Sequence, residues 1–125
     1  MSALRETVPY EFDGEIYDLE LTTYSIQQIA KKAGGIENIE NSLTNESASE
    51  QFDFAIWIIT LLMNQSIMKW NYKHSEKKEL LTEKYVALFT DFDDLTNMVN
   101  IISQVMENGT KKAIESEPSK NLTAE

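Results

Sequence analysis

The most apolar stretch of the chain is Phe54-Ala-Ile-Trp-Ile-Ile-Thr-Leu-Leu-Met63, which lies between Asp53 and Asn64. It is far shorter than the roughly 20 residues that a membrane-spanning helix needs, so it predicts a buried helix and no membrane anchor. At about 100° per residue, the apolar side chains of this helix, about 49–72, form two stripes. The first stripe contains Phe52, Ile56, Ile59, Met63, Ile67 and Trp70, and the second contains Phe54, Trp57, Leu61 and Met68. A helix that is apolar on most sides must be covered twice, by other helices of the chain or by a second protein.

Upstream of this helix, residues of about 8–21 predict a β-hairpin. Asp13-Gly14 favours a two-residue type I′ turn, because glycine accepts positive φ without steric cost. In the second arm, Tyr17-Asp-Leu-Glu-Leu21 alternates apolar and acidic residues, as is typical of a strand with one buried face. An irregular loop is the alternative interpretation.

Helical spacing predicts four more helices, at about 23–33, 36–43, 76–89 and 91–108. Thr22 or Thr23 can cap the first of them and Gly34 can end it. The prediction of a helix at 76–89 depends on the helical spacing of Leu81, Tyr85, Leu88 and Phe89. The last helix is expected to begin at Thr90 or Asp91 and to end near Asn108-Gly109, and a flexible tail is expected over 116–125.

These elements predict a mainly α fold of the small α+β class, in which an N-terminal β-hairpin precedes four to five helices packed as a small bundle. A length of 125 residues suits one domain, which we place at 1–115.

The composition excludes several functional classes. The chain has 21 acidic and 11 basic residues and a net charge of -10, which disfavours binding to nucleic acid or to anionic membranes. It has no cysteine and one histidine, His74, which we interpret as an exposed loop residue. Asp91, Asp93 and Asp94 lack the spacing of a calcium loop and suit helix capping. We therefore expect no catalytic, cofactor-binding or metal-binding residues, and no enzyme.

The net charge is unevenly distributed, because residues 1–60 hold 11 acidic and 3 basic residues whereas residues 61–125 hold 10 acidic and 8 basic residues. Three interpretations follow. The charge can keep an apolar protein soluble, it can meet a basic partner, or it can imitate nucleic-acid phosphates and so inhibit a DNA-binding protein.

The order of these elements resembles the tail assembly chaperones of long-tailed bacteriophages, especially those of phages and prophages of Gram-positive bacteria. The resemblance covers about residues 8–110. It rests on the hairpin and first helix (12–29), the Gly34-Gly35 break, the apolar helix around 55–63 and the helix entry Phe92-Asp-Asp-Leu95. The long polar connector with Tyr72 and His74 departs from the family's pattern.

The resemblance implies a non-enzymatic chaperone without a cofactor, which works in the cytoplasm of the bacterial host and is absent from the mature virion. Its implied partner is the tape measure protein, a long helical protein that it keeps soluble until tail tube subunits polymerise around it. The tail tube protein and a second copy of the chain are further candidate partners. The family also implies a longer form made by ribosomal frameshifting, for which the codons of Lys111-Lys112 or Ser119-Lys120-Asn121 are candidate sites.

As a hypothesis, one set of side chains from the apolar helix forms the partner-binding surface: Phe54, Trp57, Leu61, Met68 and Trp70. The alternative is that all five are ordinary core residues. Two other functions compete with the chaperone: an acidic inhibitor or DNA mimic that blocks a basic partner surface, and a structural virion component or oligomeric adaptor.

Overall fold

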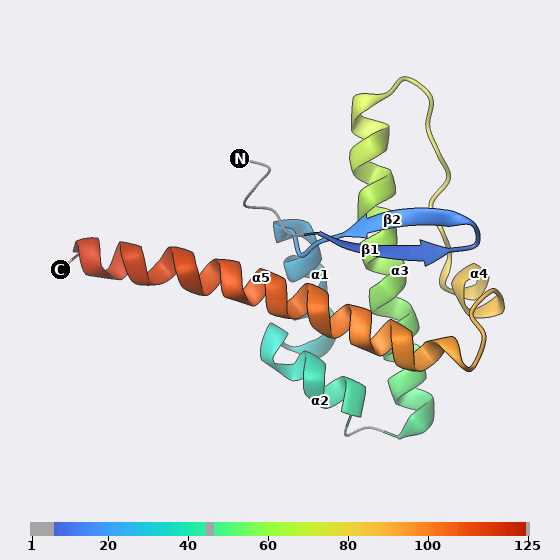
Figure 1. Ribbon diagram of the computed structural model, residues 1–125, viewed down its shortest axis with the longest axis horizontal. Coiled ribbons are helices and arrows are strands. Elements are labelled where there is room, and N and C mark those ends of the chain that lie inside the picture. The colour runs from blue at the N-terminus through green and yellow to red at the C-terminus, as the bar shows by residue number, and fades with distance from the viewer. Residues whose placement is uncertain (1–6, 45–46, 125) are drawn as a thin grey trace.

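The computed structural model describes residues 7–44 and 47–124. The described elements, in chain order, are β1 (Val8–Phe12), β2 (Glu15–Leu19), α1 (Thr23–Ala33), the 3₁₀ helix η2 (Ile36–Asn38), α2 (Ile39–Thr44), α3 (Ala48–Lys73), α4 (Glu83–Leu88) and α5 (Asp94–Ala124). The predicted class is confirmed, since the structure is mainly helical and begins with a β-hairpin. α3 is the central element, because it contacts β2 and each of the four other α-helices (Figure 1).

The hairpin has the predicted turn. Asp13 and Gly14 both have positive φ, at 51° and 80°, and the antiparallel register pairs Val8 with Leu19 and Phe12 with Glu15. Val8, Tyr10 and Phe12 are buried while the residues between them are exposed, so β1 places one face on the core. Burial raises the pKa of Tyr10, and it also raises that of Tyr17 on β2.

The start of α1 is attached to α3 through buried polar groups. Thr22 is the N-cap and forms a reciprocal capping box with Ser25, and Gly34 ends the helix in the left-handed conformation at φ 83°, as predicted. The Thr22 hydroxyl donates to the Gln65 side-chain oxygen, and the Gln65 amide donates to the Glu20 carbonyl. Because Gln65 is only 4% exposed, these bonds fix the β2–α1 corner on α3.

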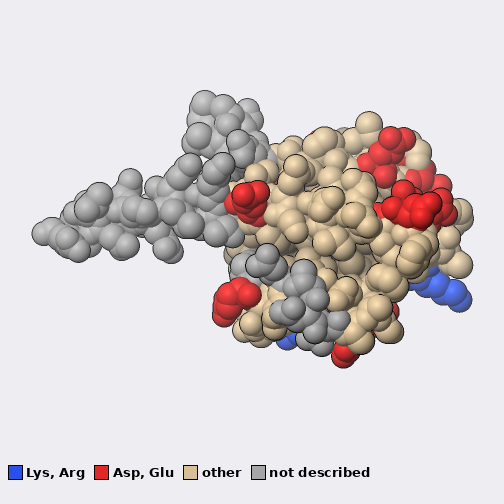
Figure 2. Space-filling model, turned by 60° about the horizontal axis from the view of Figure 1, so that its bottom comes forward, with Lys and Arg blue, Asp and Glu red and all other residues tan. Residues whose placement is uncertain are grey.

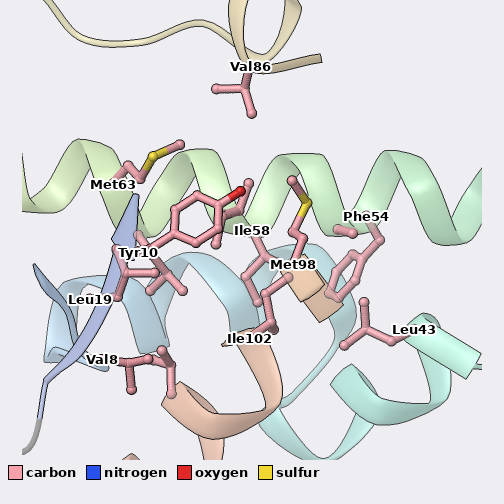
Figure 3. Close-up of a cluster of buried hydrophobic side chains, with 14 of the residues drawn as sticks. Val8, Tyr10, Leu19, Leu43, Phe54, Ile58, Met63, Val86, Met98 and Ile102 are labelled. Carbon is pink, nitrogen blue, oxygen red and sulfur yellow. The ribbon is translucent and has the colours of Figure 1, made fainter. Parts of the chain in front are cut away.

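The core forms where α3 meets the hairpin, α1 and α5 (Figure 3). Ile58, Ile59, Leu62 and Met63 of α3 are fully buried. The other fully buried large apolar side chains come from four different elements, β2, α1, α4 and α5: Leu19, Ile29, Val86, Met98, Ile102 and Val105. Burial of this apolar surface is the main force that holds the elements together.

The predicted helix 76–89 is wrong over its first half. Residues 74–82 contain no helix, and α4 is a single short helix from Glu83 to Leu88. The reason lies in two asparagines of α3 that hydrogen-bond the connector's backbone. The side chain of Asn64 pairs with both backbone groups of Leu81, at 2.8 Å and 2.7 Å, and that of Asn71 pairs with both backbone groups of Lys78, at 3.0 Å and 2.8 Å.

We call each asparagine, with its two hydrogen bonds to one connector residue, a clamp. The spacing of the two clamps explains why the connector is extended. Seven residues of helix separate Asn64 from Asn71, a rise of about 10.5 Å. Three residues of extended chain separate Lys78 from Leu81, a span of about 10 Å. An extended connector running antiparallel to α3 therefore satisfies both clamps at once, and a helical one would be too short.

The predicted bounds of the last helix are also wrong. α5 begins at Asp94 and not at 91, after a turn in which the Asp94 N–H donates to the Asp91 carbonyl. It continues through Gly109 to Ala124, so the predicted domain end at 115 falls inside a helix and 116–124 is helical where a tail was predicted. Residues 1–6 and 45–46 of the predicted domain and residue 125 of the predicted tail lie outside the described residues.

Gly109 has a packing role and does not end the helix. A Cβ at this position would lie 2.4 Å from Cδ2 of Leu21 and 2.7 Å from its Cβ. The missing side chain therefore lets α5 approach the end of the hairpin closely.

None of the described helices combines the length and the apolar character that crossing a membrane requires.

Candidate partner-binding groove

An open groove runs along α3, between α1 and the connector that precedes α4. Its volume is about 450 Å³. We call it the α3 groove and define it by its lining residues: Tyr24, Gln28, Trp57, Thr60, Leu61, Asn64, Met68, Leu80, Leu81, Thr82 and Glu83.

Three of the five predicted partner-binding residues meet in this groove. Trp57, Leu61 and Met68 are spaced four and seven residues apart, which places them on one side of α3. All three line the groove and are only partly buried. They can therefore contact another molecule without any change in the fold.

The other two predicted residues lie elsewhere. Phe54 belongs to the core and is 8% exposed, and it lines a separate pocket with Lys32 and Asp53. Trp70 lies at the C-terminal end of α3, where its ring stacks on His74 at 3.8 Å and 8°. The ammonium group of Lys78 lies 4.4 Å from the centre of the same indole. His74 is exposed, as predicted, and its Nδ1 lies 2.8 Å from the Trp70 carbonyl oxygen, so this cluster packs around the end of the helix.

Neighbouring side chains hold the Trp57 indole in place. Its ring stacks on Phe54 at 5.9 Å and 27°, and the Lys32 ammonium lies 5.3 Å from the ring centre. Aromatic stacking and a cation over an indole are each worth about 0.5–1 kcal/mol at a partly exposed site. Phe54 thus supports Trp57 from the core, although it does not itself line the groove.

The opposite wall of the groove is formed by the connector, which Asn64 holds against α3. Both hydrogen bonds between Asn64 and Leu81 lie at this wall, and next to them Leu80 is 49% exposed at the rim. The wall is therefore set by α3 itself, even though it has no secondary structure of its own.

The lining is largely neutral, and three of its polar side chains, those of Asn64, Thr60 and Thr82, already have hydrogen-bond partners. Glu83 is the only charged residue that lines the groove. The Thr60 hydroxyl donates to the Ile56 carbonyl at 2.7 Å, and the Thr82 hydroxyl accepts from the Tyr85 N–H at 3.0 Å. The groove consequently offers mainly apolar contacts, which suit the apolar face of a peptide or a helix.

A second exposed apolar region was not predicted. Tyr85, Leu88, Phe89 and Phe92 are exposed by 38%, 69%, 56% and 76%. The spacing of the first three predicted a helix, but spacing cannot show that α4 is short or that Val86 is its one fully buried residue. The aspartates on both sides of Phe92 were the available signal that this segment meets water.

Among the described residues, no three His, Asp or Glu side chains are grouped so that they could hold a metal ion. Comparison of the chain with family models, curated proteins and solved structures finds no match.

Proposed function

We propose that this chain is a non-enzymatic phage tail assembly chaperone, which binds the tape measure protein in the cytoplasm of the bacterial host and assists assembly of the tail tube. The observation that carries the proposal is the meeting of Trp57, Leu61 and Met68 in one open, largely neutral groove. The resemblance of the sequence to that chaperone family supplies the partner's identity.

The groove suits a short length of an apolar helix. The rise from Trp57 to Met68 along α3 is about 16 Å, which corresponds to about three turns of a bound helix. Two or three apolar side chains of the partner would enter it, each contributing about 1.5–3 kcal/mol before the cost of association. Such a contact is weak and reversible, as a chaperone requires when tube subunits displace it.

Acidic residues supply the second requirement, which is solubility of the complex. Glu11, Glu15 and Asp18 are exposed on the hairpin. A chain with a net charge of -10 that covers apolar helices gives the complex a repulsive surface, which opposes aggregation before assembly.

The test begins with the DNA downstream of the gene, where we expect a slippery heptamer and a very long, helix-rich reading frame. This frame is then expressed with the wild-type chain, with Trp57→Asp, or with Tyr72→Asp. Tyr72 is 91% exposed and lies outside the groove, so it is the matched control. We expect wild type and Tyr72→Asp to keep the long protein soluble and to co-purify with it, and Trp57→Asp to fail.

Circular dichroism establishes that both variants are folded, and Leu61→Asp replaces Trp57→Asp if the latter is not. A folded groove variant that binds as well as wild type would refute the groove as the binding site. Binding that is lost steeply with salt would favour the acidic inhibitor or DNA mimic, because an apolar contact is insensitive to screening. Recovery of the chain in finished particles would favour a structural virion component.

A further inference from the structure

The exposed apolar residues beyond the groove form a ridge on α4 and on the turn into α5. We define the α4 ridge as Tyr85, Leu88, Phe89 and Phe92, four large side chains within eight residues. Leu88, Phe89 and Phe92 are each more than half exposed. A soluble protein rarely leaves such a concentrated apolar surface uncovered unless it meets a partner.

The ridge is attached to the body of the protein at three points. The rings of Tyr85 and Phe89 lie 4.8 Å apart, and the Tyr85 ring packs edge-on against Phe12 of the hairpin at 6.1 Å. The Tyr85 hydroxyl also donates to the carboxylate of Asp13 in the hairpin turn.

Phe92 and Val86 make the second and third attachments. Phe92 meets Phe52 of α3 edge-on at 5.9 Å, and the fully buried Val86 fixes α4 to the core. The ridge is therefore preformed, so little conformational entropy is lost when a partner covers it.

Exposed carboxylates flank the ridge at the hairpin turn and around Phe92, and one exposed lysine, Lys84, directly precedes Tyr85. Asp13 and Glu15 are exposed at the hairpin turn that Tyr85 touches, and Asp91, Asp93 and Asp94 are exposed around Phe92. Residues 85–94 contain no lysine or arginine. In Figure 2, acidic side chains gather at the right-hand end of the molecule beside a smaller basic area, and Figure 1 shows the hairpin turn and α4 at that end.

We propose that the α4 ridge is a docking surface for a partner protein segment whose apolar side chains are flanked by lysine or arginine. Charge complementarity selects this occupant, because an acidic rim attracts a basic segment and adds specificity to the apolar contact. A second copy of the chain would bring the same carboxylates face to face at a net charge of -10 on each molecule. The inference is independent of the proposed function, since no ridge residue lines the α3 groove.

The test uses three fluorescent synthetic peptides of equal length. The first alternates leucine and lysine in an amphipathic helical pattern, the second replaces its lysines with glutamate, and the third replaces its leucines with serine. Each is titrated into the full chain by fluorescence anisotropy at about 0.05 M and 0.5 M salt. We expect the leucine–lysine peptide alone to bind tightly, and to bind less tightly at the higher salt concentration.

Variants then locate the site. The double variant Leu88→Ser/Phe92→Ser should weaken binding about tenfold or more, because two exposed apolar side chains are lost without disturbing the core. Tyr72→Ser is the control, because it removes a side chain that is even more exposed, at 91%, and does not belong to the ridge; it should bind as wild type does. Trp57→Asp removes the central contact of the α3 groove, so peptide binding that this variant retains belongs to a site outside the groove, which separates this test from that of the groove.

Four outcomes would overturn the proposal. They are equal binding of the double variant and wild type, equal binding of the serine–lysine peptide, loss of binding in Trp57→Asp, and a dimer of the free chain that Leu88→Ser/Phe92→Ser dissociates. Equal binding of the double variant, or loss of binding in Trp57→Asp, would place the binding site outside the ridge. Equal binding of the serine–lysine peptide would mean that charge alone causes the binding, and the dimer would mean that a second copy of the chain covers the ridge. Sedimentation velocity of the wild type and the double variant measures the last.

Discussion

Replacing Asn64 by alanine should release the connector from α3 at one defined point. The Asn64 side chain makes two hydrogen bonds to Leu81, one to its carbonyl at 2.8 Å and one from its N–H at 2.7 Å. A hydrogen bond of this kind contributes about 1 kcal/mol net, so the pair contributes about 2 kcal/mol. Since 1.4 kcal/mol corresponds to a factor of ten, local opening of the connector at Leu81 should become about 30 times more frequent.

Amide hydrogen exchange measures this opening directly, because the Leu81 N–H is itself one of the donors. We expect the Leu81 amide to exchange about 30-fold faster in Asn64→Ala, while amides of the α3 core change little. Asn71→Ala is the matched control and should accelerate exchange at Lys78, whose N–H donates to Asn71 at 2.8 Å. The reasoning would be refuted by an unchanged rate at Leu81 in Asn64→Ala, or by the same profile of changes in both variants.

Three further substitutions test the packing and the polar contacts. Gly109→Ala places a Cβ 2.4 Å from Cδ2 of Leu21, so we expect thermal unfolding to show a loss of about 1–3 kcal/mol in the free energy of unfolding. The loss should be smaller in a Leu21→Ala background, which removes Cδ2 and Cγ but keeps the Leu21 Cβ; an equal loss in both backgrounds would contradict the contact. The hydrogen bond to Asp13 raises the pKa of Tyr85 above 10.0. The contribution of this bond to the free energy of unfolding is therefore present below pH 10 and is lost as the pH rises through the folded-state pKa. Urea unfolding between about pH 8 and pH 11 should therefore show a smaller alkaline loss in Tyr85→Phe than in wild type, and parallel curves would exclude the bond. Gln65→Met keeps the volume but removes two buried hydrogen bonds, and should cost about 2 kcal/mol in urea unfolding; a cost below about 0.5 kcal/mol would mean that these bonds do not stabilise the β2–α1 corner.

Features that depend on neighbouring residues were predictable from the sequence. Asp13-Gly14 specifies the hairpin turn because both residues must adopt positive φ. Thr22 and Gly34 specify the ends of α1, because capping involves atoms within a few residues of the helix terminus. The apolar run of α3 likewise identifies the central helix, since a helix that is apolar on most sides must be buried on several sides.

The errors arise where distant residues meet. The Asn64 clamp joins positions 17 residues apart and converts a predicted helix into an extended connector. Gly109 looks like a helix end in the sequence, but Leu21 explains it in the structure. Neither partner can be identified from local periodicity, because the contact exists only after α3 or the hairpin has been placed.

The candidate site was predictable in part for the same reason. Periodicity separates two apolar stripes on α3, and one of them supplies Trp57, Leu61 and Met68 to the groove. It does not show that Phe54, three residues before Trp57, is buried at 8% exposure. The exposure of the α4 ridge was not predicted, because an exposed apolar stripe and a buried one have the same spacing.

Site-specific photo-crosslinking tests the central claim, that the α3 groove holds the tape measure protein, most directly. The photoreactive amino acid p-benzoylphenylalanine replaces Trp57 in one sample and Tyr72 in another, and each is irradiated with the long, helix-rich protein that we propose as the partner. We expect a covalent adduct at a helical segment of that protein from position 57 and none from position 72. Adducts of equal yield from both positions, or an adduct from position 72 alone, would contradict the groove as the binding site.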